Sequence, residues 1–349
     1  MKRLPAFALV TALPLLFAPA LLRGGDDPQP ADAEASKTIL AADLKKDLTY
    51  IASDELEGRA TPSPGQDKAA AFLAKRFEEL KLEPGGSDAT YRQKIPFTPR
   101  KRGGDAASAP APVEIANIVG ILRGTDPKAG AIVFSAHYDH IGKNKPKNPG
   151  DPKEDIINNG ADDDGSGTVS VLALAKAYAA RKTKPKRSLV FACFTGEEIG
   201  GVGSRAYVGS PAIPLGDTIC DINLEMLGRT HDIGPKRAWV TGWDVSTLGP
   251  ILAKGGKAAG VEIYPDPYPQ EGYYMRSDNA SFVAKKVIGQ TVSAGSNHPD
   301  YHTVRDEVGK IEFENLEALV RAVYLGSARI ASGEETPKPT GDSLMPKRK

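Results

Sequence analysis

The chain has 349 residues, of which 40% are hydrophobic and 26% are charged, and this composition excludes an intrinsically disordered protein. Lysine and arginine number 45 against 44 aspartates and glutamates, so the net charge of +1 gives no overall field that favours nucleic acid or an anionic surface as a partner. Two cysteines, Cys193 and Cys220, exclude a disulfide framework and a thiolate zinc cluster. The redox state of these two cysteines stays open: they form either two buried thiols or one disulfide.

Residues 1–22 have the pattern of a secretory signal peptide: a charged start, an apolar run and the small residues Ala18-Pro19-Ala20. We expect cleavage there, which would place the mature chain outside the cytoplasm, secreted or periplasmic and free of the membrane. The alternative is an uncleaved membrane anchor. We further predict a flexible leader over 23–36, one domain over 37–333, and a loose tail over 334–349.

Apolar spacing predicts two amphipathic helices near the start of the domain, over 40–51 and 69–80. The charge-rich segment Ser53–Arg59 between them is expected to be a solvated loop, or else a support for a cleft. Residues 82–112 are rich in proline, glycine and alanine, and this composition predicts a surface excursion too short for an inserted domain.

Short β-branched or continuously apolar runs predict a series of strands in the second part of the chain. They cover residues 117–122, 131–136, 188–194, 218–224, 238–241, 261–264 and 287–292. Helical patterns alternate with them, among them 168–181 and a final helix around 316–324. We therefore predict the α/β class: a three-layer αβα sandwich with a mixed, mostly parallel central sheet. Ligands of such sheets bind beyond the carboxyl ends of the strands.

Acids and imidazoles follow several of these strands. His137 ends one strand, Glu197 and Glu198 follow the next, and Glu225 follows another. A glycine-bounded acidic turn, Gly160-Ala-Asp-Asp-Asp-Gly-Ser-Gly167, precedes a helix and suits a metal-binding turn better than a core or a helix.

Paired divalent metals, about 3.5 to 4 Å apart, generate a nucleophile at neutral pH by acidifying a shared water. Such a pair needs one bridging carboxylate and further histidine or carboxylate ligands. We predict that Asp162 bridges the pair, that His137 and Glu225 complete one zinc site, and that Glu198 and His302 complete the other.

Glu197 precedes a predicted ligand, so its carboxylate would face the water and act as the general base. Tyr301 could donate its phenol to the oxyanion that develops, or it could be a packed aromatic beside the site. Asp139 is expected to hold the imidazole of His137, and Asp163 to brace the turn, while Asp164 is assigned to turn chemistry.

Three further histidines, His140, His231 and His298, are interpreted as packed or solvated residues.

Together these motifs resemble the M28 family of zinc peptidases, from about Leu48 to about Glu314. The resemblance includes Ala136-His-Tyr-Asp-His140, the acidic turn, Thr195 to Gly200, Asn223-Leu-Glu-Met226 and Asp300-Tyr-His302. It implies an enzyme, a two-zinc aminopeptidase that hydrolyses peptide bonds at free amino termini, with the ligands and base named above. Peptide or protein amino termini would be the substrate, and the oligomeric state is left open.

The sequence departs from the family at three places. Glu225 stands where many relatives carry aspartate, and Asn279 stands where histidine is frequent. Val304 stands where relatives often carry a proline after His-Thr. The alternatives on the same fold are a glutaminyl cyclase-like acyltransferase, which uses one zinc, and a carboxypeptidase or dipeptidase. The latter would need a basic pocket, for which Arg229, Arg276 and Arg305 are candidates. A non-catalytic binding scaffold is the alternative from another class.

Overall fold

The computed structural model describes residues 27–99, 111–295 and 298–345. The predicted signal peptide at 1–22 lies outside these residues. Within the described ranges, none of the helices combines the length and the apolar character that a membrane span requires.

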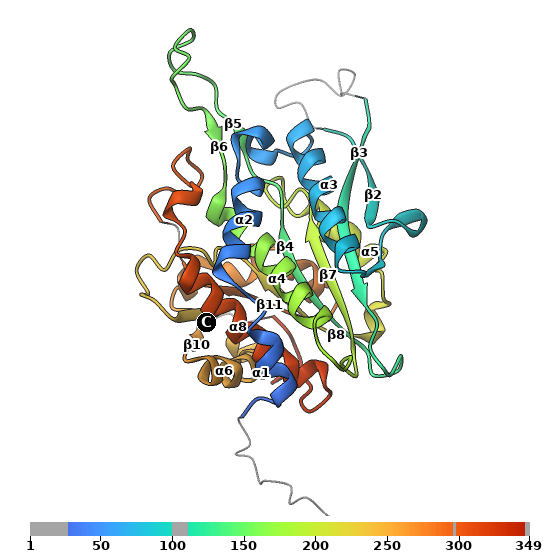
Figure 1. Ribbon diagram of the computed structural model, residues 1–349. Helices are drawn as coiled ribbons and strands as arrows, with labels where there is room; N and C mark the ends of the chain where they lie inside the picture. Colours follow the sequence, from blue (N-terminus) through green and yellow to red (C-terminus); the bar gives the residue numbers. More distant parts are fainter. Residues whose placement is uncertain (1–26, 100–110, 296–297, 346–349) are drawn as a thin grey trace, which may run out of the picture.

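A nine-stranded mixed sheet forms the centre of the described residues, in the order β1-β3-β7-β4-β8-β11-β9-β10 with β2 also paired to β3 (Figure 1). The strands are β1 (Glu83–Pro84), β2 (Arg92–Phe97), β3 (Val113–Leu122), β4 (Ala131–His137), β7 (Ser188–Phe194), β8 (Thr218–Leu224), β9 (Arg237–Val240), β10 (Glu262–Pro265) and β11 (Ile288–Ser293). The central strands β7, β4, β8 and β11 are mutually parallel, so their carboxyl ends meet at one edge. A separate small hairpin pairs β5 (Gly142–Lys143) with β6 (Ile157–Asn158).

Helices cover both faces of this sheet. They are α1 (Pro30–Ser36), α2 (Ala41–Ile51), α3 (Pro64–Glu79), α4 (Gly167–Ala179), α5 (Val202–Gly209), α6 (Leu248–Ala259), α7 (Asn279–Ala284) and α8 (Phe313–Ala331). Residues 54–59 form a short 3-10 helix. The predicted three-layer αβα class is therefore confirmed.

The alternation along β4 explains the two hydrophobic cores. Ile132 and Phe134 pack into the larger core beneath α4 and α8, while Ala131 and Val133 face the smaller core beneath α5 and α7. Every residue of β4 is buried. Because both faces of a central parallel strand are covered, its sequence is apolar from Ala131 to Phe134, and the buried hydroxyl of Ser135 is hydrogen-bonded to Asp221 and Asn223.

Two predictions of irregular chain are wrong. Within the predicted leader, residues 30–36 form α1, because Ala35 packs into the core and Asp32 pairs with Arg181. The described part of the predicted tail, 334–345, packs on the domain, since Lys338 O accepts from Thr247 N at 2.9 Å. Within the predicted surface excursion over 82–112, the described residues include two strands, β1 and β2, which pair with β3.

The segment Ser53–Arg59 is not a solvated loop, because it supports the neighbouring loops through Arg59. The guanidinium of Arg59 is fully buried and donates to four main-chain carbonyls: those of Tyr138 at 2.7 Å, Ile51 at 2.6 Å, Asn159 at 2.6 Å and Gly160 at 3.0 Å. Burial lowers the pKa of Arg59 to about 10, which still leaves the side chain charged at neutral pH. One cation thus joins α2 to the loop after β4 and to the loop before the acidic turn.

We predict that Arg59→Lys destabilises the chain by about 3 kcal/mol or more, because an ammonium cannot reach four separated carbonyls and orphaned buried acceptors cost about 1–3 kcal/mol each. Urea unfolding measures the change. Arg123→Lys is the matched control, since Arg123 is exposed and pairs with Glu83; we expect a change within about 0.5 kcal/mol there. Equal stabilities for the two variants would contradict this role of Arg59.

Candidate metal centre

The carboxyl ends of the central strands deliver most of the predicted site residues to one place. His137 is the last residue of β4, Glu197 and Glu198 follow β7, and Glu225 directly follows β8. His302 comes from the loop between β11 and α8. Because β4, β7 and β8 are parallel neighbours, the polar side chains after them converge at the same sheet edge.

Two groups of side chains there have the spacing of metal ligands, and Asp163 belongs to both. We call His137, Asp163 and Glu225 the first group, and His140, Asp163, Glu198 and His302 the second group. The ligand atoms within each group lie within 4.8 Å of one another. Sequence reasoning therefore named His137, Glu198, Glu225 and His302 among the residues that the structure brings together.

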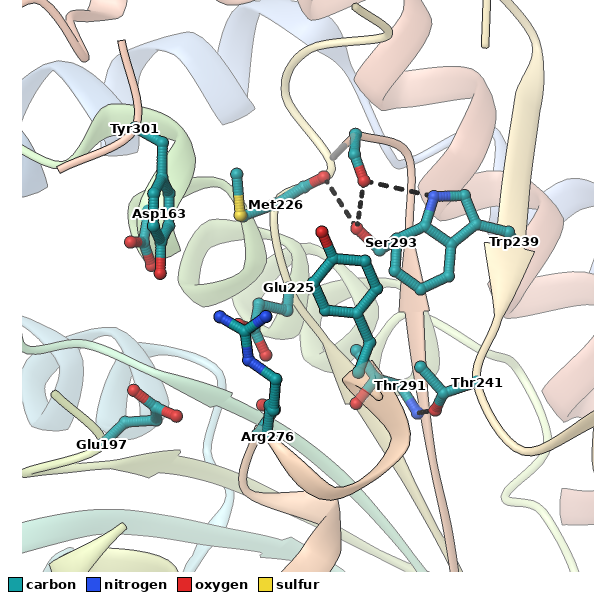
Figure 2. A pocket seen from close by; sticks show the side chains of 13 residues that line it. Asp163, Glu197, Glu225, Met226, Trp239, Thr241, Arg276, Thr291, Ser293 and Tyr301 are labelled. Atoms are coloured by element: carbon teal, nitrogen blue, oxygen red, sulfur yellow. Dashed lines mark hydrogen bonds between the residues drawn. The ribbon is translucent and has the colours of Figure 1, made fainter. Parts of the chain in front are cut away.

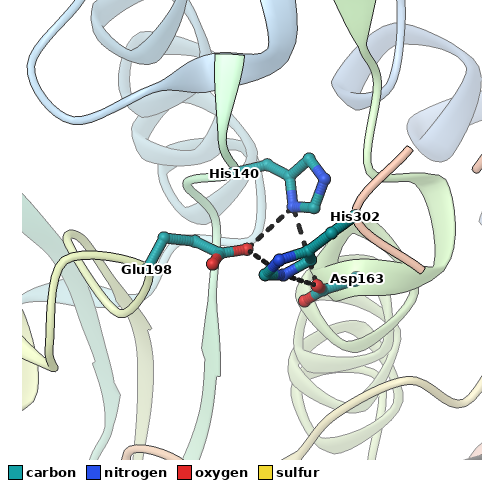
Figure 3. Close-up of side chains that lie close together, drawn as sticks. All are labelled: His140, Asp163, Glu198 and His302. Atoms are coloured by element: carbon teal, nitrogen blue, oxygen red, sulfur yellow. Dashed lines mark ion pairs between the residues drawn. The ribbon is translucent and has the colours of Figure 1, made fainter. Parts of the chain in front are cut away.

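The second group has the dimensions of a tetrahedral zinc site (Figure 3). His140 Nδ1 lies 2.9 Å from Glu198 Oε1 and 3.8 Å from Asp163 Oδ2, and His302 Nε2 lies 3.3 Å and 3.0 Å from the same two atoms. Zinc–nitrogen bonds of about 2.0–2.1 Å at tetrahedral angles separate ligand atoms by about 3.3–3.4 Å. The four side chains thus surround a space of the size that zinc requires.

The donor atoms themselves indicate a cation. His137 Nε2, His140 Nδ1, Asp163 Oδ2, Glu198 Oε1 and His302 Nε2 are buried and make no hydrogen bond. Buried polar atoms are normally hydrogen-bonded, so five such atoms facing one another fit a missing ligand. Burial opposes protonation of His302, yet the adjacent carboxylates of Asp163 and Glu198 raise its pKa to about 10, so the site favours positive charge.

The three aspartates of the acidic turn differ in their partners. Asp164 accepts backbone N–H groups from Gly167 at 3.0 Å, Met226 at 3.2 Å and His137 at 3.2 Å. Its carboxylate therefore caps α4 and fixes the end of β4. The assignment of Asp164 to turn chemistry agrees with this geometry.

The prediction that Asp162 bridges the metals is wrong. Asp162 turns away from both groups: its Oδ1 accepts from Gly228 N at 2.7 Å and Ser166 Oγ at 3.1 Å, and its Oδ2 lies 3.2 Å from His298 Nε2. Because its Oδ1 is held by these two donors and its Oδ2 faces His298, away from both groups, Asp162 braces the turn. Asp162 and Asp163 have exchanged the two roles that the sequence suggested.

Asp163 is the carboxylate that faces three imidazoles. It lies 3.3 Å from His137 Nε2 and 3.0 Å from His302 Nε2. Among the described residues no backbone N–H donates to its side chain. Burial opposes ionisation of Asp163, but the adjacent imidazoles of His137 and His302 outweigh it and hold the pKa of this carboxyl well below its usual range.

The interpretation of His140 as a packed or solvated residue is wrong, because its side chain belongs to the second group of candidate ligands. Its ring is buried against the start of the acidic turn: a Cβ at Gly160 would lie 2.5 Å from its Cγ. Gly160 also has a φ of +56°, which favours glycine. The glycine that begins the turn is therefore required for the approach of His140.

Asp139 lies where the sequence placed it, behind His137. His137 Nδ1 is 3.1 Å from Asp139 O and 3.7 Å from Asp139 Oδ1, so the proton on Nδ1 leaves the lone pair of Nε2 directed at the first group. The same carboxylate accepts from Glu197 N at 3.1 Å. Asp139 thus orients a candidate ligand and the candidate base together.

Glu197 and Tyr301 both line a pocket beside the two groups, together with Asp163, Glu225, Met226 and Trp239 (Figure 2). Burial, with repulsion from Glu225 and Asp278, raises the pKa of Glu197 well above its usual range. Burial also raises the pKa of Glu225 to about 7. Tyr301 stacks on His302 with ring centroids 3.9 Å apart, and burial raises the pKa of its phenol, so it stays a hydrogen-bond donor.

Asp306 supports the acidic turn, and no local sequence pattern indicates this role. Its carboxylate accepts from Asp162 N at 3.0 and 3.1 Å and from Asp163 N at 3.0 Å. The main chain of the acidic turn is thereby held from a loop about 140 residues away in the sequence. Such a contact depends on the fold and leaves no local signal.

The remaining predicted residues lie apart from the two groups. His298 is buried against Asp162, and His231 is exposed, as the packed or solvated interpretation allows. Cys193 on β7 and Cys220 on β8 are both buried free thiols, and β4 separates their strands. Burial raises the pKa of both.

Known proteins share this sequence pattern and this fold. A probable zinc metalloprotease of Pyrenophora tritici-repentis is 27% identical over 205 residues, which cover 59% of this chain and 44% of that protein. The LapA aminopeptidase of Legionella pneumophila superposes with a TM-score of 0.65 at 24% identity, covering 93% of this chain and 80% of that one. A glutaminyl cyclase of Bacteroides thetaiotaomicron has a TM-score of 0.61 at 14% identity, with coverages of 84% and 98%.

The chain spans less than half the length of the first curated relatives that it matches. The pattern described as Peptidase family M28 matches residues 117–325, a range that contains β4, the acidic turn, Glu197, Glu225 and His302. Because this match covers more than half of the 349 residues, the chain belongs to peptidase family M28.

Proposed function

We propose that this chain is a zinc-dependent aminopeptidase, which hydrolyses the first peptide bond of substrates with a free amino terminus. The observation that carries the proposal is the pair of ligand groups that share Asp163, next to the uncommitted carboxylate of Glu197. Membership in the family supports it. The pattern of residues 1–22 supports action outside the cytoplasm.

The residues have distinct tasks in this proposal. Bound zinc would acidify a coordinated water so that a nucleophile is available near neutral pH. Glu197 takes a proton from the attacking water and delivers it to the leaving amine, a task that suits a carboxyl whose pKa is raised by burial. Tyr301 donates its phenol to the oxyanion, and Asp139 keeps His137 and Glu197 oriented.

We propose two zinc ions per chain, bridged by Asp163. This gives a direct test against the neighbouring aspartate. Asp163→Asn should bind less than one zinc per chain, because both groups lose their shared carboxylate, whereas Asp162→Asn should retain about two. Metal analysis after gel filtration measures both. Two retained ions in Asp163→Asn would contradict the bridging role.

We also propose that His140 is a fourth protein ligand in the second group. With it, that group supplies four donors, the number typical of closed zinc sites, while the first group supplies three and leaves a position for water or substrate. The two ions would then differ in affinity. The ion in the second group would be bound more tightly, and the ion in the first group would keep a position for water or substrate.

His140→Ala tests this inequality through metal affinity. We expect the affinity of the tighter zinc to fall by more than about 100-fold, the upper end for loss of an outer-shell partner. Competition with a chromogenic chelator measures it without recourse to activity. His231→Ala is the control, since His231 is exposed and outside both groups. An unchanged affinity in His140→Ala would make His140 only a hydrogen-bond partner of Glu198.

Glu197→Gln separates catalysis from metal binding. We expect both zinc ions to remain and kcat on an aminoacyl anilide to fall by about 10²–10⁴-fold, because glutamine accepts no proton from water. Metal analysis and steady-state kinetics on the same preparation give the two results. Normal turnover would exclude Glu197 as the base.

Peptides blocked at one terminus decide between the alternatives. Cleavage only when the amino terminus is free supports the aminopeptidase, and cleavage of amino-blocked peptides favours a carboxypeptidase. Ring closure of amino-terminal glutamine without hydrolysis favours a cyclase. A chain that binds zinc and converts none of these substrates would be a binding scaffold.

A further inference from the structure

A second hollow adjoins the candidate active-site pocket on the far side of Glu197. We call it the basic groove; it has a volume of about 550 Å³ and is lined by α5, α7 and the loops before them. Its lining residues are Glu197, Gly200, Gly201, Ser204, Arg205, Val208, Met275, Arg276, Ser277, Ala280, Ser281, Ala284 and Lys285. Most of these side chains are small, and this leaves room for an extended peptide segment. The active-site pocket has only about 60 Å³.

Three exposed cations line the basic groove: Arg205, Arg276 and Lys285. Within the described ranges none of them has a carboxylate partner in an ion pair. Arg205 donates to Gly200 O, and the Arg276 guanidinium lies 5.1 Å from the ring centre of Tyr273. Of the residues that the structure describes, Glu197 is the one acid that lines the groove, and the buried Asp278 behind it attracts Arg205 electrostatically.

The other candidate arginines are neutralised, in contrast. Arg229 lies 2.9 Å and Arg305 2.7 Å from Asp300, which also pairs with Lys310 at 2.8 Å. These three cations hold the pKa of Asp300 well below its usual range. Of the three arginines named from the sequence, Arg276 is therefore the one available to a substrate.

The basic groove and the active-site pocket share Glu197, Arg276 and Ser277. A base that delivers its proton to the leaving amine must lie where the amino-terminal residue ends and the leaving segment begins. The pocket toward Met226 and Trp239 is small, so it suits the residue before the scissile bond. The groove beyond Glu197 is then the place for the segment after it.

We infer that the basic groove binds the leaving segment of the substrate and selects segments that carry a carboxylate. This inference rests on the proposed aminopeptidase function and names its substrate class. The carboxylate is either the free carboxyl terminus of a short peptide or an aspartate or glutamate side chain just after the scissile bond. In the reaction the C–N bond breaks, the water oxygen bonds to the carbonyl carbon, and the amine leaves with the proton from Glu197.

Matched peptides with one amino-terminal residue test the selection and separate the two sources. Leu-Gly against Leu-Gly-amide isolates the terminal carboxylate, and Leu-Glu-amide against Leu-Gln-amide isolates the side chain. With the zinc-loaded full chain we expect kcat/KM to favour the carboxylate in at least one pair by about fivefold or more, the value for one ion pair at about 4 Å in water. The preference should shrink as salt is raised.

Removing the positive charges of the groove one at a time tests which cations select the carboxylate. In Arg205→Gln, Lys285→Gln and Arg276→Gln the ratio between acidic and neutral peptides should fall toward one. Arg237→Gln is the control: Arg237 is exposed and pairs with Glu262 outside the groove, so the ratio should not change.

Equal kcat/KM values within both peptide pairs would overturn the inference and leave the aminopeptidase proposal intact, as would a ratio unchanged in all three groove variants. Failure to cleave any peptide or anilide with a free amino terminus would instead overturn the proposed function. Cleavage of amino-blocked peptides that requires their free carboxyl terminus would also overturn the inference, because Arg276 would then anchor the substrate of a carboxypeptidase.

Discussion

The burial of three adjacent carboxylates is the constraint on which the site depends. A buried charge is costly unless it is paired or hydrogen-bonded, and the fold meets this cost differently for each aspartate. Backbone donors satisfy Asp164. Gly228 and Ser166 donate to Oδ1 of Asp162, whose Oδ2 faces His298. Asp163 faces imidazoles and the carboxylates of Glu198 and Glu225. The carboxylate that the protein leaves without backbone donors is therefore the one that a cation must neutralise, and this is why both ligand groups meet there.

Holding that turn in place requires contacts from distant parts of the chain. Arg59 binds carbonyls on both loops that deliver His140 and the turn, and Asp306 binds the main-chain N–H groups of Asp162 and Asp163. Arg59, a cation, binds main-chain carbonyl groups, and Asp306, an anion, binds main-chain N–H groups. The two supports are therefore complementary in charge. Both act on the main chain, so the three aspartate side chains keep their separate roles.

The sequence predicted the strands and the residues at their ends, because both leave local signals. The bounds of β7 and β8 agree with the predicted runs, and His137, Glu198 and Glu225 meet as parallel pairing requires. The choice between Asp162 and Asp163 had no local signal, since neighbouring residues of one turn differ only in where the backbone directs them. His140 was missed for a related reason. It lies three residues after the predicted ligand His137, and its own role as a ligand depends on the space that Gly160 leaves for its ring. The helix at 30–36 was missed because its stability comes from packing against α8 rather than from its composition.

The two hollows that meet at Glu197 differ in shape and charge, and this difference bears on the direction of cleavage. A pocket of about 60 Å³ has room for one end of a peptide and little room for a chain that continues beyond it. The groove of about 550 Å³ on the other side places no such limit. Carboxylates of the metal centre line the small pocket, and Arg205 and Lys285 line the groove beyond the shared Arg276. A peptide with its ammonium inward and its carboxylate outward is therefore the favoured orientation. The same field disfavours the reversed peptide, so electrostatics and the small size of the pocket both favour cleavage from the amino terminus.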